Sequence, residues 1–265
     1  MAKAAKVLAS MGAEAIDINM GCPQHRLSRH GEGAALMNNP EKAAAIVSAV
    51  KNAAGLPVSV KMRAGYDEPS VKAGYTAERL AKTVEKAGAD MIVIHPRLKS
   101  QMFSGMPDHS ITLRVRKAVD IPVVANGNLD NPSLAKEVHD KLLGMCEEKG
   151  LDKACAGVML SRGIRGRPGL LSQMERFLTS GERWSSDLQG TIRTIRRHTQ
   201  YSIQCYGEQQ GIKEMRRHLP YYIKGLPCSK KLSAQVINIE NMESLEAWLN
   251  EVEQCEHNRD WVKSK

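Results

Sequence analysis

MIVIH, at residues 91–95, is a short apolar run that ends in a polar side chain. Runs of this length, rich in β-branched residues, are typical of strands buried in a parallel sheet. Four more runs of this kind precede or follow it, namely AIDIN at 15–19, PVSVKMR at 57–63, PVVAN at 122–126 and AGVML at 156–160. Together these runs predict a sheet of five parallel strands.

Helical patterns separate the predicted strands. They cover residues 40–53, 75–87, 112–118 and 132–148, and a further helix is expected before the first strand at 2–11. Because a helix follows each strand, we expect neighbouring parallel strands to be joined by right-handed crossovers. This repetition predicts an α/β fold, and by itself it fits both an open sheet and a (β/α)8 barrel.

Polar residues stand where the predicted strands end. They are Asn19, Lys61 with Arg63, His95 with Arg97, and Asn126. Both open α/β sheets and barrels place their functional sites at the carboxyl ends of parallel strands. Any one of these residues could simply cap the next loop, but four strand ends in succession favour a site.

The strand pattern stops near Pro168, and a helical pattern follows it. We therefore divide the chain into an α/β part at 1–175 and a helical part at 176–265. Residues 176–239 carry eleven basic and four acidic side chains, whereas residues 240–265 carry three basic and seven acidic ones. Most such basic surfaces are only solvated.

One cluster in this basic segment favours a more specific interpretation. Lys213, Arg216, Arg217 and His218 are followed by two adjacent tyrosines, Tyr221 and Tyr222. Cations beside aromatic rings suit a nucleic acid, which offers both phosphates and exposed bases.

The composition sets broad limits on function. The 265-residue chain has a formal net charge of +9 and a pI of about 9.3, which favours a polyanionic partner, although many basic proteins have none. No apolar run reaches the roughly 18 residues of a membrane span, and no signal peptide is evident, so we expect a cytoplasmic protein without membrane association. The six cysteines show no CxxC or CxH spacing, which predicts neither a metal site nor disulfides.

The segment Asp17-Ile-Asn-Met-Gly-Cys-Pro23, continuing to Gly33-Ala-Ala-Leu-Met37, resembles the signature of the tRNA-dihydrouridine synthase family. Further motifs agree with that family in order and spacing, namely VKMR at 60–63, HPR at 95–97 with QMFSG at 101–105, ANG at 125–127 and MLSRG at 159–163. Glu214–His218 and Tyr222–Leu226 resemble the helical domain of its bacterial B-type branch. The resemblance extends from residue 2 to residue 253. Its motifs are jointly specific, although each alone is weak.

This resemblance implies a fold and a reaction. The five strands would belong to an incomplete (β/α)8 TIM barrel, followed by a helical domain that binds tRNA. The reaction would reduce the C5–C6 double bond of a uridine in tRNA, with FMN as cofactor and NADPH as reductant. Reduced FMN would pass hydride to C6, and the Cys22 thiol would protonate C5 as general acid. From the residues alone, Cys22 could equally be a nucleophile or a structural loop residue.

The resemblance also implies a set of binding residues. Lys61 and His95 would contact the flavin ring, while Asn126, Gly127, Ser161, Arg162 and Gly163 would bind its phosphate. Asn19, Arg63, Arg97 and Gln101 would contact the uridine, and Arg216, Arg217 and His218 would contact the body of the tRNA.

The sequence departs from the family pattern in three places. Pro96 and Ser161 stand where the family usually has glycine. The family's first strands, with an Ala-Pro-Met type flavin loop, have no counterpart, so we expect Met1 to be internal to a longer gene product that is a monomer. Because five strands leave two open sheet edges, we expect this chain alone to bind FMN weakly or not at all and to be a poor enzyme. Two alternatives are an inactive truncated remnant that retains RNA binding and another flavin-dependent oxidoreductase that acts on a free pyrimidine.

Overall fold

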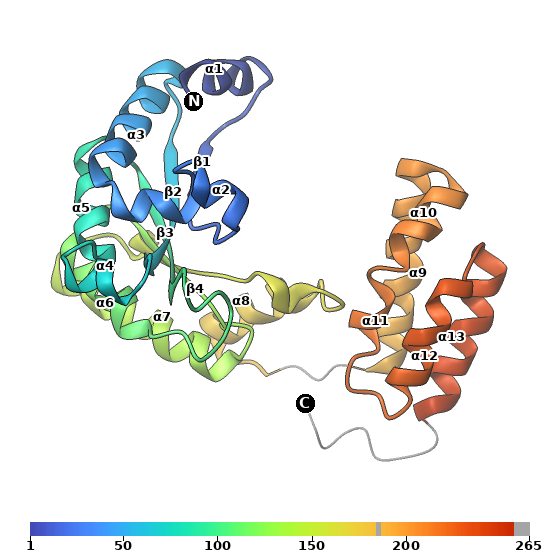
Figure 1. The fold of residues 1–265 in the computed structure, drawn as a ribbon. Helices are drawn as coiled ribbons and strands as arrows, with labels where there is room; N and C mark the ends of the chain where they lie inside the picture. The colour runs from blue at the N-terminus through green and yellow to red at the C-terminus, as the bar shows by residue number, and fades with distance from the viewer. Residues whose placement is uncertain (184–186, 257–265) are drawn as a thin grey trace. The chain divides into compact units, whose positions relative to one another are not determined.

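The structure is a computed structural model that describes residues 1–183 and 187–256. The chain forms two compact units, Met1–Ser161 and Arg162–Lys265, and each is described by itself (Figure 1). This division places residues 162–175 with the second unit, whereas the sequence analysis grouped them with the first.

The first unit contains a parallel sheet whose five strands follow one another in chain order. Doubly wound sheets reverse their strand order at a switch point, whereas barrels keep it. The described sheet contains no reversal, so the α/β class and the incomplete barrel are confirmed. The strands are β1 (Ile16–Met20), β2 (Val58–Gly65), β3 (Met91–Leu98), β4 (Val123–Asn126) and β5 (Ala156–Met159).

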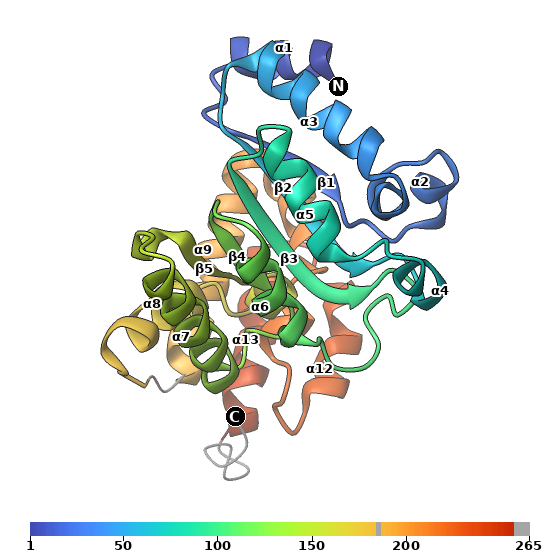
Figure 2. The same cartoon turned by 90° about the vertical axis from the view of Figure 1, so that its left-hand side faces the viewer.

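Helices cover one face of this sheet. Figure 1 shows α3, α5, α6 and α7 along one side of the strands, and Figure 2 views the unit from that side. Each of these four helices begins at a residue whose side chain accepts a backbone N–H bond, which defines the start of the helix. The helical elements of the unit are α1 (Ala2–Ser10), α2 (His25–Arg29), η1 (Gly33–Asn38), α3 (Pro40–Ala54), α4 (Glu68–Lys72), α5 (Ala77–Lys86), α6 (His109–Ala118), α7 (Pro132–Glu148) and η2 (Lys153–Cys155).

The strands present different side chains to their two faces. Ile18, Val60 and Ile92 belong to the apolar core shared with the helices. Because neighbouring residues of a strand point to opposite faces, Asn19 and Lys61 lie on the other face, where strand register pairs them. The polar strand-end residues therefore share the face that points away from these helices.

The second unit is helical and has its own apolar core, which includes Ile195, Ile212 and Leu249. Buried Trp248 also donates its indole N–H to the carbonyl of Leu232 at 3.0 Å, which ties α13 to α12. The elements are η3 (Arg162–Ile164), α8 (Leu170–Ser180), α9 (Leu188–Tyr206), α10 (Glu208–Met215), α11 (Leu219–Tyr222), α12 (Ser229–Gln235), η4 (Val236–Asn238) and α13 (Met242–Glu256).

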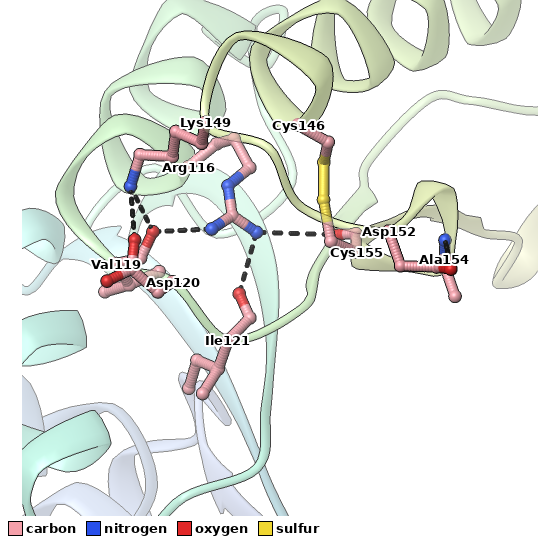
Figure 3. The surroundings of a disulfide bond; sticks show 9 residues. All are labelled: Arg116, Val119, Asp120, Ile121, Cys146, Lys149, Asp152, Ala154 and Cys155. Carbon is pink, nitrogen blue, oxygen red and sulfur yellow. Dashed lines mark hydrogen bonds and ion pairs between the residues drawn. A yellow bond between two sulfur atoms is a disulfide. The ribbon is translucent and has the colours of Figure 1, made fainter.

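The expectation that the protein lacks disulfides is wrong. Cys146 pairs with Cys155, and Cys228 pairs with Cys255. Sequence spacing could not reveal these pairs, because their members are 9 and 27 residues apart and meet only through tertiary packing. Figure 3 shows the first bond, which joins the end of α7 to the η2 turn before β5.

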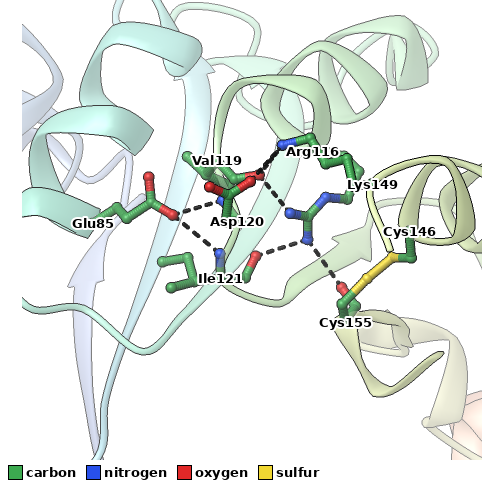
Figure 4. Close-up of polar contacts among 8 residues, drawn as sticks. All are labelled: Glu85, Arg116, Val119, Asp120, Ile121, Cys146, Lys149 and Cys155. Atoms are coloured by element: carbon green, nitrogen blue, oxygen red, sulfur yellow. Dashed lines mark hydrogen bonds and ion pairs between the residues drawn. A yellow bond between two sulfur atoms is a disulfide. The ribbon is translucent and has the colours of Figure 1, made fainter. Parts of the chain in front are cut away.

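A buried arginine lies beside this first disulfide. The guanidinium of Arg116 donates to the carbonyl of Ile121 at 2.7 Å and to that of Cys155 at 3.3 Å (Figure 4). Nearby, Lys149 forms a 2.7 Å ion pair with Asp120. These contacts lie at the amino ends of β4 and β5, the end of a barrel that usually serves stability.

The described residues contain neither a membrane-spanning helix nor a metal-binding group of side chains. None of their helices is long and apolar enough to cross a membrane. Within the same residues, no three His, Cys, Asp or Glu side chains are grouped so that they could hold a metal ion.

Candidate active site at the carboxyl ends of the strands

The loop after β1 fixes the backbone of Cys22. The side-chain oxygen of Asn19 accepts hydrogen bonds from the backbone N–H of Gly21 at 3.0 Å and of Cys22 at 2.9 Å. The carbonyl of Cys22 accepts from Ala34 N at 3.0 Å, at the start of η1. Gly33 approaches this carbonyl so closely that an added Cβ would lie 2.8 Å from it, and its φ of +56° favours glycine. Cys22 is half-buried and outside both disulfides.

Lys61 and Asn126 form the next part of the site. The Lys61 ammonium donates to Asn126 Oδ1 at 3.2 Å, which links β2 to β4. Asn126 then donates through Nδ2 to the carbonyl of Met159 at 2.8 Å and to Ser161 Oγ at 2.9 Å. Burial lowers the pKa of Lys61 below its ordinary value, the Arg63 charge lowers it further, and Asp17 opposes the shift. These contacts join the carboxyl ends of β2, β4 and β5.

His95 contacts an aromatic ring, that of Phe103, and lies close to the backbone of Gly127. Its ring stacks with that of Phe103 at 6.5 Å between centroids. On Gly127, whose φ is +113°, an added Cβ would lie 2.8 Å from His95 Cδ2. The ring nitrogen Nε2 lies 3.1 Å from a guanidinium nitrogen of Arg97. The imidazole is therefore buried and its orientation is set by these neighbours.

Arg63 and Arg97 are both buried at the strand ends, with 2% of each residue exposed. Arg63 donates to the carbonyl of Gly21 at 2.8 Å, to that of Leu98 at the end of β3 and to that of Met102 in the loop after β3. Arg97 donates to the carbonyls of Ser104 at 3.2 Å and Gly105 at 2.6 Å. Both guanidinium groups therefore hold loops in addition to any contact with a ligand.

The remaining predicted residues of this part lie in turns. Gln101 accepts the backbone N–H of Leu98 at 2.7 Å through its side-chain oxygen. Arg162 and Gly163 follow β5 after two further residues and begin the second unit as part of η3. Pro96 lies in β3 where the pairing with β2 shifts register, since proline has no N–H for the ladder.

Three members of the basic cluster of the helical unit form a turn, while Lys213 lies in α10. Arg216, Arg217 and His218 connect α10 to α11, rather than continuing a helix. Arg216 donates to the carbonyl of Ile239 at 2.8 Å, so it also connects elements. The side chain of Arg217 is 76% exposed and pairs with Glu214 at 3.2 Å. Arg217 is the more accessible of the two arginines.

The two tyrosines beside this turn differ. Tyr222 is buried, and burial raises its pKa to about 12. Tyr221 is 41% exposed, and the guanidinium of Arg165 lies 5.3 Å from the centre of its ring. Only Tyr221 could stack on a base without a rearrangement.

A second arginine–tyrosine pair, on α9, was not predicted from the sequence. On α9, Arg197 lies over the ring of Tyr201 at 5.5 Å and donates to its hydroxyl at 2.9 Å. Tyr201 is 51% exposed. The sequence feature that could have indicated this pair is its spacing of four residues, because that spacing places both side chains on one face of a helix.

Fold and site together define an α/β protein whose polar residues gather at the carboxyl ends of parallel strands. The family model described as Dihydrouridine synthase (Dus) matches residues 1–258. The chain therefore belongs to the dihydrouridine synthase family.

Relatives with this name are similar along most of the chain. A probable tRNA-dihydrouridine synthase of Rickettsia bellii is 35% identical over 237 residues, covering 89% of this chain and 68% of the relative. A protein of the same name from Rhodobacter capsulatus is 38% identical, covering 84% of this chain and 64% of the relative. The tRNA-dihydrouridine synthase B of Pseudomonas aeruginosa is 29% identical, covering 92% and 69%. The chain thus spans about two thirds of the length of these relatives.

Proposed function

We propose that this chain reduces the C5–C6 double bond of a uridine in tRNA, with FMN as cofactor and NADPH as the source of electrons. The observation that carries the proposal is the placement of Cys22. Its loop follows β1 beside Lys61, because strand register pairs Asn19 with Lys61. A potential proton donor and a cation therefore lie at the same end of the sheet.

The residues present fit a flavin phosphate and ring edge. The loops after β4 and β5 are joined by the bond from Asn126 to Ser161, and paired loops at these positions commonly bind phosphate in barrels. Gly127 leaves a space beside His95 that a Cβ would fill. In this proposal Lys61 and His95 face the ring, and Asn126, Gly127, Ser161, Arg162 and Gly163 bind the phosphate.

Bound FMN, once reduced by NADPH, would supply the hydride for C6 of the uracil. The lysine ammonium of Lys61 offers a positive charge where a reduced ring gains negative charge. Its lowered pKa reflects burial, which also strengthens such an interaction.

Cys22 completes the addition by giving the proton of its thiol to C5. The thiolate that remains takes a proton from solvent, so one hydride and one proton are added per uridine and one NADPH is oxidised. A general acid has to be placed against the atom that it protonates, and the bonds from Asn19 and Ala34 fix the Cys22 backbone. As substrate contacts we propose Asn19, Arg97 and Gln101.

The helical unit would bind the body of the tRNA. Exposed Arg217 is suited to a phosphate contact, and Tyr221 offers a ring face to a base. Arg216 and His218 lie in the same turn. Because uracil in folded tRNA is stacked or paired, the base must leave its stack to reach Cys22.

The dependence of NADPH oxidation on RNA tests the proposal. Under anaerobic conditions with FMN, we expect tRNA that lacks dihydrouridine to accelerate NADPH oxidation, with one NADPH consumed per dihydrouridine formed. Free uridine at the same concentration should not do so. Equal oxidation with free uridine would favour an oxidoreductase of small pyrimidines, and no response to either substrate would contradict the proposal.

A further inference from the structure

Arg63 links the Cys22 loop to the loop after β3. Its Nε donates to the carbonyl of Gly21 at 2.8 Å. Its NH1 donates to the carbonyls of Leu98 at 3.0 Å and Met102 at 2.8 Å. One buried guanidinium thus connects two loops that are about 80 residues apart in the chain.

The bond to Gly21 acts on the peptide group that leads directly into Cys22. The Gly21 carbonyl and the Cys22 N–H belong to one planar unit. Arg63 donates to the carbonyl of this unit, and Asn19 Oδ1 accepts a hydrogen bond from its N–H at 2.9 Å. With both edges occupied, this peptide plane has little freedom to rotate, and the Cα of Cys22 is fixed with it.

Packing supports the same role. A Cβ added at Gly21 would lie 3.4 Å from the carbonyl of Lys61 and 3.6 Å from Cγ of Arg63, so the loop lies directly on β2. The guanidinium of Arg63 also lies 5.6 Å from the ring centre of Phe103. Arg63 is therefore enclosed by both loops.

We infer that Arg63 is a positioning residue, which sets the location of Cys22 through the Gly21–Cys22 peptide. The catalytic importance of this position rests on the proposed function, because the position of the thiol matters for the rate only if the thiol reacts. This positioning role differs from a substrate contact, because a substrate contact would bind the uridine and leave the Cys22 loop unchanged. A displacement of about 1 Å at a reacting group can reduce a rate by roughly 100-fold.

Arg97 provides a matched control. It is equally buried and also donates to backbone carbonyls, but these belong to Ser104 and Gly105 and not to the Cys22 loop. Arg63→Lys and Arg97→Lys each keep the positive charge while removing the fork of donors. General loosening of the protein would affect both variants alike.

Hydrogen exchange of the backbone tests the inference without flavin or tRNA. In the full chain, Arg63→Lys should accelerate exchange at the Gly21 and Cys22 amides by roughly tenfold to 100-fold, the effect expected for the loss of a charge-assisted hydrogen bond. Arg97→Lys should leave these amides unchanged. Asn19→Ala removes the acceptor of both amides and shows the size of a full release.

Unchanged exchange at Gly21 and Cys22 in Arg63→Lys would overturn the inference, and so would an equal increase in Arg97→Lys. If Arg63→Lys fails to fold, as judged by its far-ultraviolet circular dichroism, Arg63→Gln repeats the comparison. A kinetic test adds to this: kcat should fall while KM for tRNA stays the same. A raised KM with normal exchange would instead make Arg63 a substrate contact. Because exchange needs no turnover, its outcome is separate from that of the proposed function.

Discussion

At the scale of single residues, several side chains of the candidate site form hydrogen bonds to the backbone of neighbouring loops. Asn19 was expected to contact the uridine, and the structure shows its oxygen occupied by two amides of the Cys22 loop. Arg63 and Arg97 likewise bind backbone carbonyls. Residue type and strand position predicted that these side chains lie at the carboxyl ends of the strands, but the sequence could not show that their partners are neighbouring loops.

Lys61 gives a prediction about stability and pH. Burial lowers its pKa below the ordinary 10.5, so between these two pKa values the unfolded chain binds more protons than the folded one. Stability of the wild type should therefore rise as pH increases toward about 10.5, because the cost of a buried charge disappears.

Lys61→Met removes this charge, and we expect it to unfold at a higher temperature than the wild type at pH 7 while binding FMN less well. Thermal unfolding of both proteins across pH 7 to 10 measures the effect. The difference between them should shrink as the pH rises. A constant difference would show that charge burial at Lys61 is not its source.

At the scale of elements, the sequence predicted the strands well because each is a short apolar run between helices. The run at 91–95 became β3, which continues to Leu98 through Pro96. That extension was not predictable, since proline usually ends a strand, and here it is accommodated by a register shift against β2. The disulfides were missed because their partners meet only after α7 and α13 have packed.

The disulfide at the end of α7 should contribute measurably to stability. Replacing Cys146 and Cys155 together by Ser should lower the free energy of unfolding by about 2–4 kcal/mol, mainly by releasing a constraint on the unfolded chain. Urea unfolding monitored by circular dichroism measures this. A reductant should lower the free energy of unfolding of the wild type by more than that of the double variant, because the variant has only the Cys228–Cys255 bond left to lose. Equal stability of oxidised wild type and variant would contradict the expectation.

The turn between α10 and α11 predicts different roles for two adjacent arginines. Arg217→Ala should weaken tRNA binding and reduce the slope of log K against log salt by about 0.7–0.9, as for one lost phosphate contact. It should not change stability, because the side chain is mostly exposed. Arg216→Ala should instead lower the melting temperature, because its bond to the Ile239 carbonyl is lost.

Binding titrations at several salt concentrations, together with thermal unfolding, separate these roles. An unchanged salt slope for Arg217→Ala would show that this residue contacts solvent rather than tRNA in the complex.

At the scale of the whole molecule, the chain combines two units of different character. The first carries the strand-end residues, and the second carries the basic turn with the exposed Tyr221 beside it. Each has its own core and its own disulfide. The net charge of +9 suits a polyanionic substrate, which the proposed reaction supplies.

The formation of dihydrouridine in a single turnover tests the central claim most directly. The chain is mixed in excess with tRNA that lacks dihydrouridine, at saturating FMN and NADPH, and the modified nucleoside is measured by mass spectrometry. We predict that the wild type forms dihydrouridine and that Cys22→Ala slows its formation by about 10²–10⁴-fold, the usual contribution of a general acid, while NADPH still reduces the flavin. Formation at the same rate in Cys22→Ala, or none by the folded wild type, would contradict the account.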